Sequence, residues 1–163
     1  MKVTFTRTGE RRYRVSVEGD SIEALYMEPA PGYDARLPHD AAHFIVENEL
    51  GIGGAVFGQL AAGGTAKTFR SDNLKNPRRA KKRGLELSKA HHKDAVFSEH
   101  AVYAAQSRWL NAEVKPDTDI STADIKRICA AFDEFSSRWS ELPVGGSIEL
   151  VWKHHALRTR TKK

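Results

Sequence analysis

Hydrophobic and polar residues alternate over residues 1–28, which is the pattern of half-buried β-strands. Two apolar sets show this alternation, with one polar residue between successive members: Val3 and Phe5, then Tyr13, Val15 and Val17. Turn-forming glycines at Gly9 and Gly19 divide this run, and a third strand is predicted over 22–27. We therefore expect a small antiparallel meander at this end of the chain.

Apolar residues spaced three or four positions apart predict helices in the middle of the chain. One helix is expected over 38–51, because proline suits a first helical turn and glycine accepts the left-handed C-cap. The small-residue segment 53–64 predicts a short buried helix that packs closely against a neighbour. A longer helical segment is expected over 78–111, with a break near Gly84 or Asp94.

The segment from Ser121 to Trp139 carries the clearest helical pattern. One face of it is apolar and consists of Ile125, Ile128, Phe132, Phe135 and Trp139. Ser121 and Asp124 resemble a capping box at its start, and Lys115-Pro116-Asp117 interrupts the helical pattern before it. This face could be shared between two chains as readily as within one, so a homo-oligomer stays open.

A last strand is predicted over 147–153, after a turn rich in glycine and proline at 142–146. It places Ile148, Leu150 and Trp152 on one face, and we expect it to return to the N-terminal sheet. The predicted fold class is α+β, with a small antiparallel sheet from both ends of the chain packed against a helical middle. We expect a single domain over 1–156 and a basic, disordered tail over 157–163.

Length and composition fit one domain of ordinary size. The chain has 163 residues, of which 40% are hydrophobic and 9% aromatic, which is enough for a core. No apolar run reaches the roughly 20 residues of a transmembrane helix, and the alternating start M-K-V-T-F-T-R-T is unlike a secretory signal. The one cysteine, Cys129, lies in a helical pattern and is expected to be a small buried hydrophobe. These features predict a cytoplasmic protein without membrane contact.

Positive charge is concentrated in one segment. The formal net charge is +5, and residues 67–93 hold ten Lys or Arg against two acids. Such a segment suits contact with nucleic acid or an acidic protein, and the alternative is a solvated helix face. The predicted phosphate-contacting residues are Arg70, Lys75, Arg78, Arg79, Lys82 and Arg83. Aromatic residues for base stacking and helix-turn-helix or zinc-finger signatures are missing.

The sequence L-P-H-D-A-A-H-F-I-V-E carries the clearest sign of chemistry. His39 and His43 are four residues apart, so on a helix both rings lie on the same face and can reach one metal ion. The alternative is a structural pair, with His39 serving the helix end and His43 bonding to a strand backbone. Signatures of serine hydrolases and of phosphate-binding loops are absent from the sequence.

The five residues His39-Asp40-Ala41-Ala42-His43 resemble the H-E-x-x-H helix of zinc peptidases. That resemblance implies His39 and His43 as ligands of zinc or another divalent metal, and Asp40 as the catalytic base. Aspartate is one methylene shorter than the glutamate of the motif, which puts peptidase chemistry in doubt. Glu47 lies about 12 Å from His39 along a helix axis. Glu47 could bind a metal ion together with His43 alone, or it could fix the His43 tautomer. Glu47 is also our second catalytic candidate, after Asp40.

A third metal ligand must come from elsewhere in the chain. The candidates are Glu99, His100, His91 and His92, with His154 and His155 as weaker ones. The L-P-H-D-x-x-H-F-x-V-E block, a following A-A-G-G and the ending L-P-x-G-G-S-I-E-L-x-W resemble a family of small uncharacterised bacterial proteins, a likeness that implies no activity. We predict a metal-binding protein in which metal-assisted hydrolysis is conceivable. One alternative is a non-enzymatic module that binds nucleic acid or an acidic partner, and another is a purely structural or regulatory protein.

Overall fold

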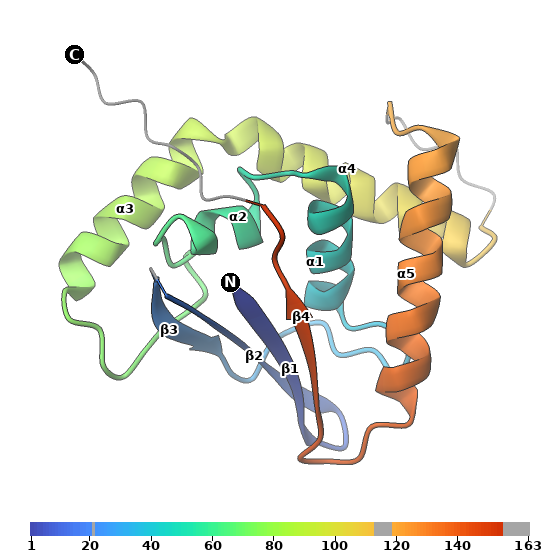
Figure 1. The fold of residues 1–163 in the computed structure, drawn as a ribbon, viewed down its shortest axis with the longest axis horizontal. Coiled ribbons are helices and arrows are strands. Elements are labelled where there is room, and N and C mark those ends of the chain that lie inside the picture. The colour runs from blue at the N-terminus through green and yellow to red at the C-terminus, as the bar shows by residue number, and fades with distance from the viewer. Residues whose placement is uncertain (21, 113–118, 155–163) are drawn as a thin grey trace.

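The sheet is built from both ends of the chain, as Figure 1 shows for the computed structural model, which describes residues 1–20, 22–112 and 119–154. Its four strands are β1 (Lys2–Gly9), β2 (Arg12–Gly19), β3 (Ile22–Met27) and β4 (Ser147–Val151). They are ordered β3-β2-β1-β4, and each neighbouring pair is antiparallel. The α+β fold class and the return of the last strand to the N-terminal sheet are therefore confirmed.

The register of the sheet places its apolar residues in one layer. Phe5 lies opposite Val15 on β2 and opposite Ile148 on β4. All three side chains are at most 1% exposed. Because side chains alternate between the two faces of a strand, this register gathers the predicted apolar positions on the face that meets the helices.

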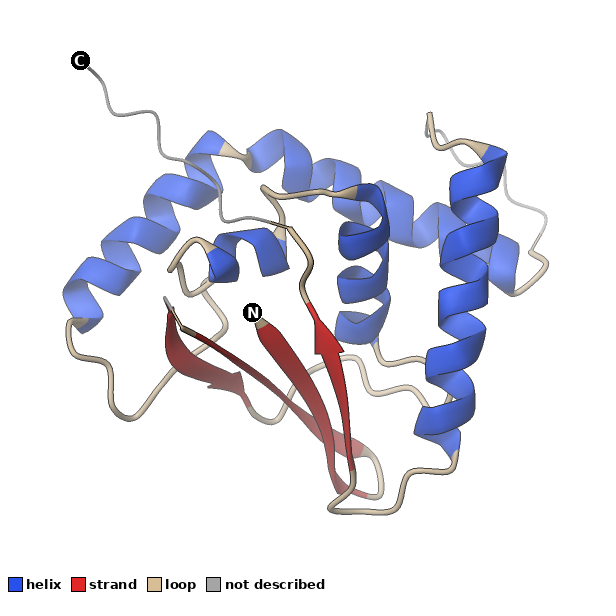
Figure 2. Ribbon diagram, in the orientation of Figure 1, coloured by secondary structure: helices blue, strands red, loops and turns tan. Residues whose placement is uncertain are grey.

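Five helices are described: α1 (His39–Leu50), α2 (Val56–Ala61), α3 (Pro77–Ala90), α4 (His92–Trp109) and α5 (Thr122–Ser140). Helix α1 packs against α2, α4 and α5. Figure 2 shows the helices gathered on one side of the sheet, with α1 between the sheet and α4. No helix among the described residues is long and apolar enough to cross a membrane.

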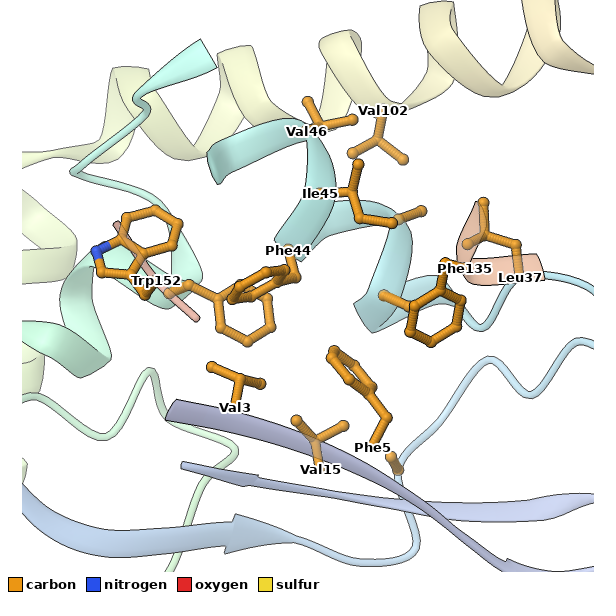
Figure 3. Close-up of a cluster of buried hydrophobic side chains, with 14 of the residues drawn as sticks. Val3, Phe5, Val15, Leu37, Phe44, Ile45, Val46, Val102, Phe135 and Trp152 are labelled. Atoms are coloured by element: carbon orange, nitrogen blue, oxygen red, sulfur yellow. The ribbon is translucent and has the colours of Figure 1, made fainter. Parts of the chain in front are cut away.

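Helix α1 is enclosed by the rest of the protein. Phe44 points from it toward Val3 and Val15 of the sheet, whereas Val46 points the opposite way toward Val102 of α4 (Figure 3). All seven residues over 41–47 are buried, because this part of α1 is covered by neighbouring elements on several sides. The polar side chains in this stretch are therefore inside the protein.

The helices α1 and α5 have the predicted caps, and the break in the long helical segment is now placed at one residue. Helix α1 ends where Gly51 adopts a φ of 68°, and Ser121 caps α5 by accepting a hydrogen bond from the Asp124 N–H. The expected break in the long helical segment falls at His91, close to Asp94, while Gly84 lies inside α3. A Cβ on Gly84 would sit 3.2 Å from the hydroxyl oxygen of a neighbouring loop threonine, so this glycine serves close packing.

The remaining expectations concern Cys129, the break at Lys115-Pro116-Asp117 and the basic tail. Cys129 is partly buried and not fully buried as predicted, and burial raises the pKa of its thiol. The break at Lys115-Pro116-Asp117 and the basic tail over 157–163 lie outside the described residues.

Candidate metal centre

Two helices bring together three side chains that could hold a metal ion. His39 and His43 come from the first turns of α1, and Glu99 comes from α4, which packs across it. One possible ligand atom from each residue lies within 4.8 Å of the other two. His39 and Glu99 are exposed and His43 is buried, so the group lies at the surface with one ligand anchored in the interior.

The ring of His43 is held by a chain of hydrogen bonds. The Ser98 hydroxyl donates to Oε1 of Glu47 at 2.9 Å, and the same Ser98 oxygen lies 3.1 Å from Nδ1 of His43. A serine hydroxyl has one hydrogen, so the Ser98 oxygen must accept from His43. In neutral His43 the proton therefore sits on Nδ1, and Nε2 carries the free lone pair.

Nε2 of His43 faces the other two members of the group. It is buried and has no hydrogen-bond partner among the described residues. The nearest carboxylate oxygen is Oε2 of Glu99, at 3.4 Å, and the His39 ring lies edge-on at 4.6 Å between centroids. A buried nitrogen lone pair without a partner is costly unless something binds it, and a metal ion is one such partner.

Negative groups surround His43 and favour a positive charge beside it. Burial opposes protonation of this imidazole, but the contact with Glu47 and the charges of Glu47, Glu99 and Asp40 outweigh it and raise the pKa of His43. The same surroundings favour any cation that approaches Nε2. A metal ion would bind in competition with the proton, because histidine ligates in its neutral form.

Glu47 lies one helical turn beyond His43 and is fully buried. Its Oε1 is the acceptor for Ser98, and Oε2 accepts the Phe57 N–H at 2.9 Å. This carboxyl group therefore ties α1 to both α2 and α4. The predicted catalytic role of Glu47 stays a prediction, and its contacts agree with the other role considered for it, which was to fix the His43 tautomer through hydrogen bonding.

Asp40 is directed toward the sheet. Its Oδ2 accepts a hydrogen bond from the Tyr13 hydroxyl of β2. Burial raises the pKa of Asp40, although the Tyr13 hydrogen bond and the charges of His39 and His43 act in the opposite direction. The Asp40 side chain therefore links the start of α1 to β2, and its predicted role as a base stays a prediction.

His39 is positioned by the loop before α1. Its backbone N–H donates to the carbonyl oxygen of Gly32 at 3.1 Å. Gly32 has a φ of 71°, and a Cβ added to it would lie 2.6 Å from the Cβ of His39. Gly32 thus meets two requirements that a larger residue would violate, namely a left-handed backbone and close contact with a candidate ligand.

Glu99 alone, among the candidates considered for a third ligand, joins the two histidines within the described part of the chain. The other described candidates lie outside the group: His91, His92, His100 and His154. His155 lies outside the described residues.

The six basic residues predicted to contact phosphates have different surroundings, and their role stays a prediction. Four of them line a cleft beside α3: Lys75, Arg79, Lys82 and Arg83. Arg70 instead stacks over the Tyr26 ring at 5.2 Å and donates to the backbone oxygen of Glu28 at 2.8 Å. Arg78 is exposed and does not line the cleft.

Sequence reasoning missed two residues that support the site. Ser98 is a lone hydroxyl on a helix face that continues with Ala101, Val102 and Ala105, all buried. A polar residue at that spacing is a signal that could have marked it. Tyr13 occupies an ordinary apolar position of the strand pattern, and no local signal connects its hydroxyl with Asp40.

Two imidazoles and one carboxylate form a ligand set that suits zinc and other divalent transition metals. Because two of the three groups are exposed, such an ion would keep positions open to water. Comparison with known protein families, curated proteins and solved structures finds no match to this chain.

Proposed function

We propose that the protein binds one divalent transition-metal ion, with zinc as the reference ion, through His39, His43 and Glu99. The observation that carries the proposal is the geometry of His43. Its Nδ1 is engaged by Ser98, and its buried Nε2 faces a histidine and a glutamate without a hydrogen-bond partner among the described residues. Hydrogen bonding of the second ring nitrogen is a regular feature of histidine ligands in metal sites.

The finer part of the proposal is metal-assisted hydrolysis. Three protein ligands with an open side are typical of catalytic zinc sites, in which the ion lowers the pKa of a bound water to about 7. Asp40 and Glu47 support this site as positioning residues. The Asp40 carboxyl group is held by Tyr13, and the Glu47 carboxyl group is held by Ser98 and Phe57.

Zinc titration of metal-free protein tests the proposal. We expect one equivalent to bind, measured by competition with a chromogenic chelator. Glu99→Gln should weaken binding at least about tenfold, because it replaces a charged ligand with a neutral amide oxygen, and even groups that only orient metal ligands contribute 10–100-fold. The matched control is Glu134→Gln on α5, where the carboxylate is exposed and makes only a 3.9 Å ion pair with Arg138. Substoichiometric binding, or an equal loss in both variants, would contradict the proposal.

Replacing Gly32 with alanine should disturb the site through His39. The new Cβ would strain a left-handed backbone and collide with the Cβ of His39. We expect zinc affinity to fall about tenfold and unfolding free energy to fall by about 1–2 kcal/mol. Gly145→Ala is the control, since φ there is 89° and an added Cβ would meet no described atom within 4 Å. It should lower stability similarly while leaving zinc affinity unchanged, and equal affinities in the two variants would refute the role given to Gly32.

A further inference from the structure

A cleft of about 770 Å³ lies between α3, the outer strand β3 and the end of α2. Strand β3 is at the edge of the sheet, and the loop before α3 pairs with it through one isolated bridge between Tyr26 and Arg70. The volume falls within the roughly 300–1,000 Å³ of small-molecule sites. None of the three candidate metal ligands lines this cleft, so it is a separate feature of the surface.

Four cationic side chains line this cleft: Lys75, Arg79, Lys82 and Arg83. The last three have helical spacings of three and four, so they share the face of α3 that borders the cleft. Two carboxylates also line it, those of Glu23 and Glu86. Positive charge therefore predominates inside a concave space, where it is most effective at concentrating anions.

A backbone contact holds one of these four charges in place. Nε of Arg83 donates to the carbonyl oxygen of Ala62 at 3.3 Å, which anchors the guanidinium at the end of α2. Oε1 of Glu23 accepts a hydrogen bond from the backbone N–H of Lys75 at 3.0 Å. This bond occupies one of the two carboxylates in the cleft and ties the loop before α3 to β3. An anchored guanidinium presents its remaining N–H donors in the planar fork that matches phosphate oxygens.

Apolar side chains form another part of the lining, beside the polar Thr65 and Asn76. Leu25 and Leu60 are buried, and Ile22 and Leu74 are partly buried. Because Ile22 and Leu74 still expose apolar surface, a ligand that covered them would gain more than one that left them facing water. The lining therefore favours a molecule with an apolar body and an anionic end.

We propose that this cleft binds a small organic molecule that carries two or more phosphates, of the size of a nucleoside diphosphate. The arrangement favours such a ligand over a nucleic-acid duplex. A duplex needs cations on an outward surface, whereas four cations here converge on one concave space, and Arg78 and Lys81 of the same helix lie outside it. The proposal does not depend on metal binding by His39, His43 and Glu99.

Calorimetric titration of metal-free protein with ADP and with pyrophosphate tests this inference. ADP should bind, and more tightly than pyrophosphate, because only ADP can also cover the apolar lining. The double variant Arg79→Ala/Lys82→Ala should weaken ADP binding at least tenfold, because it removes two of the phosphate-facing cations. The matched control is Arg78→Ala/Lys81→Ala, which removes the same charge from the same helix and should change ADP affinity less than twofold.

Three outcomes would overturn the inference: no binding of ADP or pyrophosphate, equal affinities for the two, or an equal loss in both double variants. An equal loss would show that only the overall charge of α3 matters. A 16-base-pair duplex is titrated in parallel. Duplex binding that is stronger than ADP binding and falls equally in both double variants would assign the basic segment to nucleic acid instead and reject the cleft.

Discussion

Replacing His43 with alanine is expected to weaken zinc binding by more than about a hundredfold. Structural zinc sites with four protein ligands contribute about 10–16 kcal/mol, so one ligand accounts for roughly 3 kcal/mol, which corresponds to a factor above a hundred. His43 should reach this value because its Nε2 is already oriented and desolvated, so little is lost in ordering the ligand when the ion binds. Competition with a chelator of known zinc affinity measures the change.

The control is His100→Ala, because His100 is exposed, follows Glu99 directly on α4 and lies outside the three-residue group. It should change zinc affinity less than twofold. Circular dichroism and thermal unfolding of both metal-free variants show whether His43→Ala keeps the fold. A folded His43→Ala protein that binds zinc as tightly as the wild type would exclude the proposed centre.

Replacing Glu47 with alanine should lower the free energy of unfolding by about 3 kcal/mol. The change strands the buried N–H of Phe57 and the hydroxyl of Ser98, and each unpaired buried group costs about 1–3 kcal/mol. It also leaves a cavity at a fully buried position. Urea denaturation of metal-free protein, followed by far-ultraviolet circular dichroism, measures the change.

Two further variants interpret this result. Glu47→Gln keeps the volume and one carbonyl acceptor, so it should lose less than half as much stability. Glu49→Ala removes a carboxylate of the same helix that makes only a 3.6 Å contact with Arg127, and it should cost under about 1 kcal/mol. If Glu47→Ala and Glu49→Ala were equally mild, the buried carboxyl group would not be the link between α1, α2 and α4 that its contacts indicate.

The strands and helices of this protein were predictable because each depends on local spacing. Period-two alternation identified β1 and β2, and period-3.6 spacing identified α5, since both patterns arise from the direction of side chains on a single element. The return of β4 to the N-terminal sheet was also predicted, because an apolar strand at the far end of the chain needs a sheet to join, but the pattern did not say that β1 would be its partner. The exact break between α3 and α4 was not, because His91 carries no strong breaking signal.

The candidate site was predictable only in part. His39 and His43 were visible because they lie on one helix, but Glu99 was one of several candidates, and only the packing of α1 against α4 selects it. Sequence spacing also left open whether the polar residues of α1 face water. Burial of every residue over 41–47 answers this for His43 and Glu47.

The pairing of β1 with β4 also determines when the sheet can be completed. The hydroxyl oxygens of Thr6 and Ser147 lie 2.8 Å apart although the residues are 141 positions apart in the chain. During synthesis, one edge of β1 stays unpaired until nearly all of the described chain has left the ribosome. Contacts of such long sequence separation slow folding, because loop-closure entropy is lost before they form. The helical middle therefore has time to gather around α1 before the last strand closes the sheet.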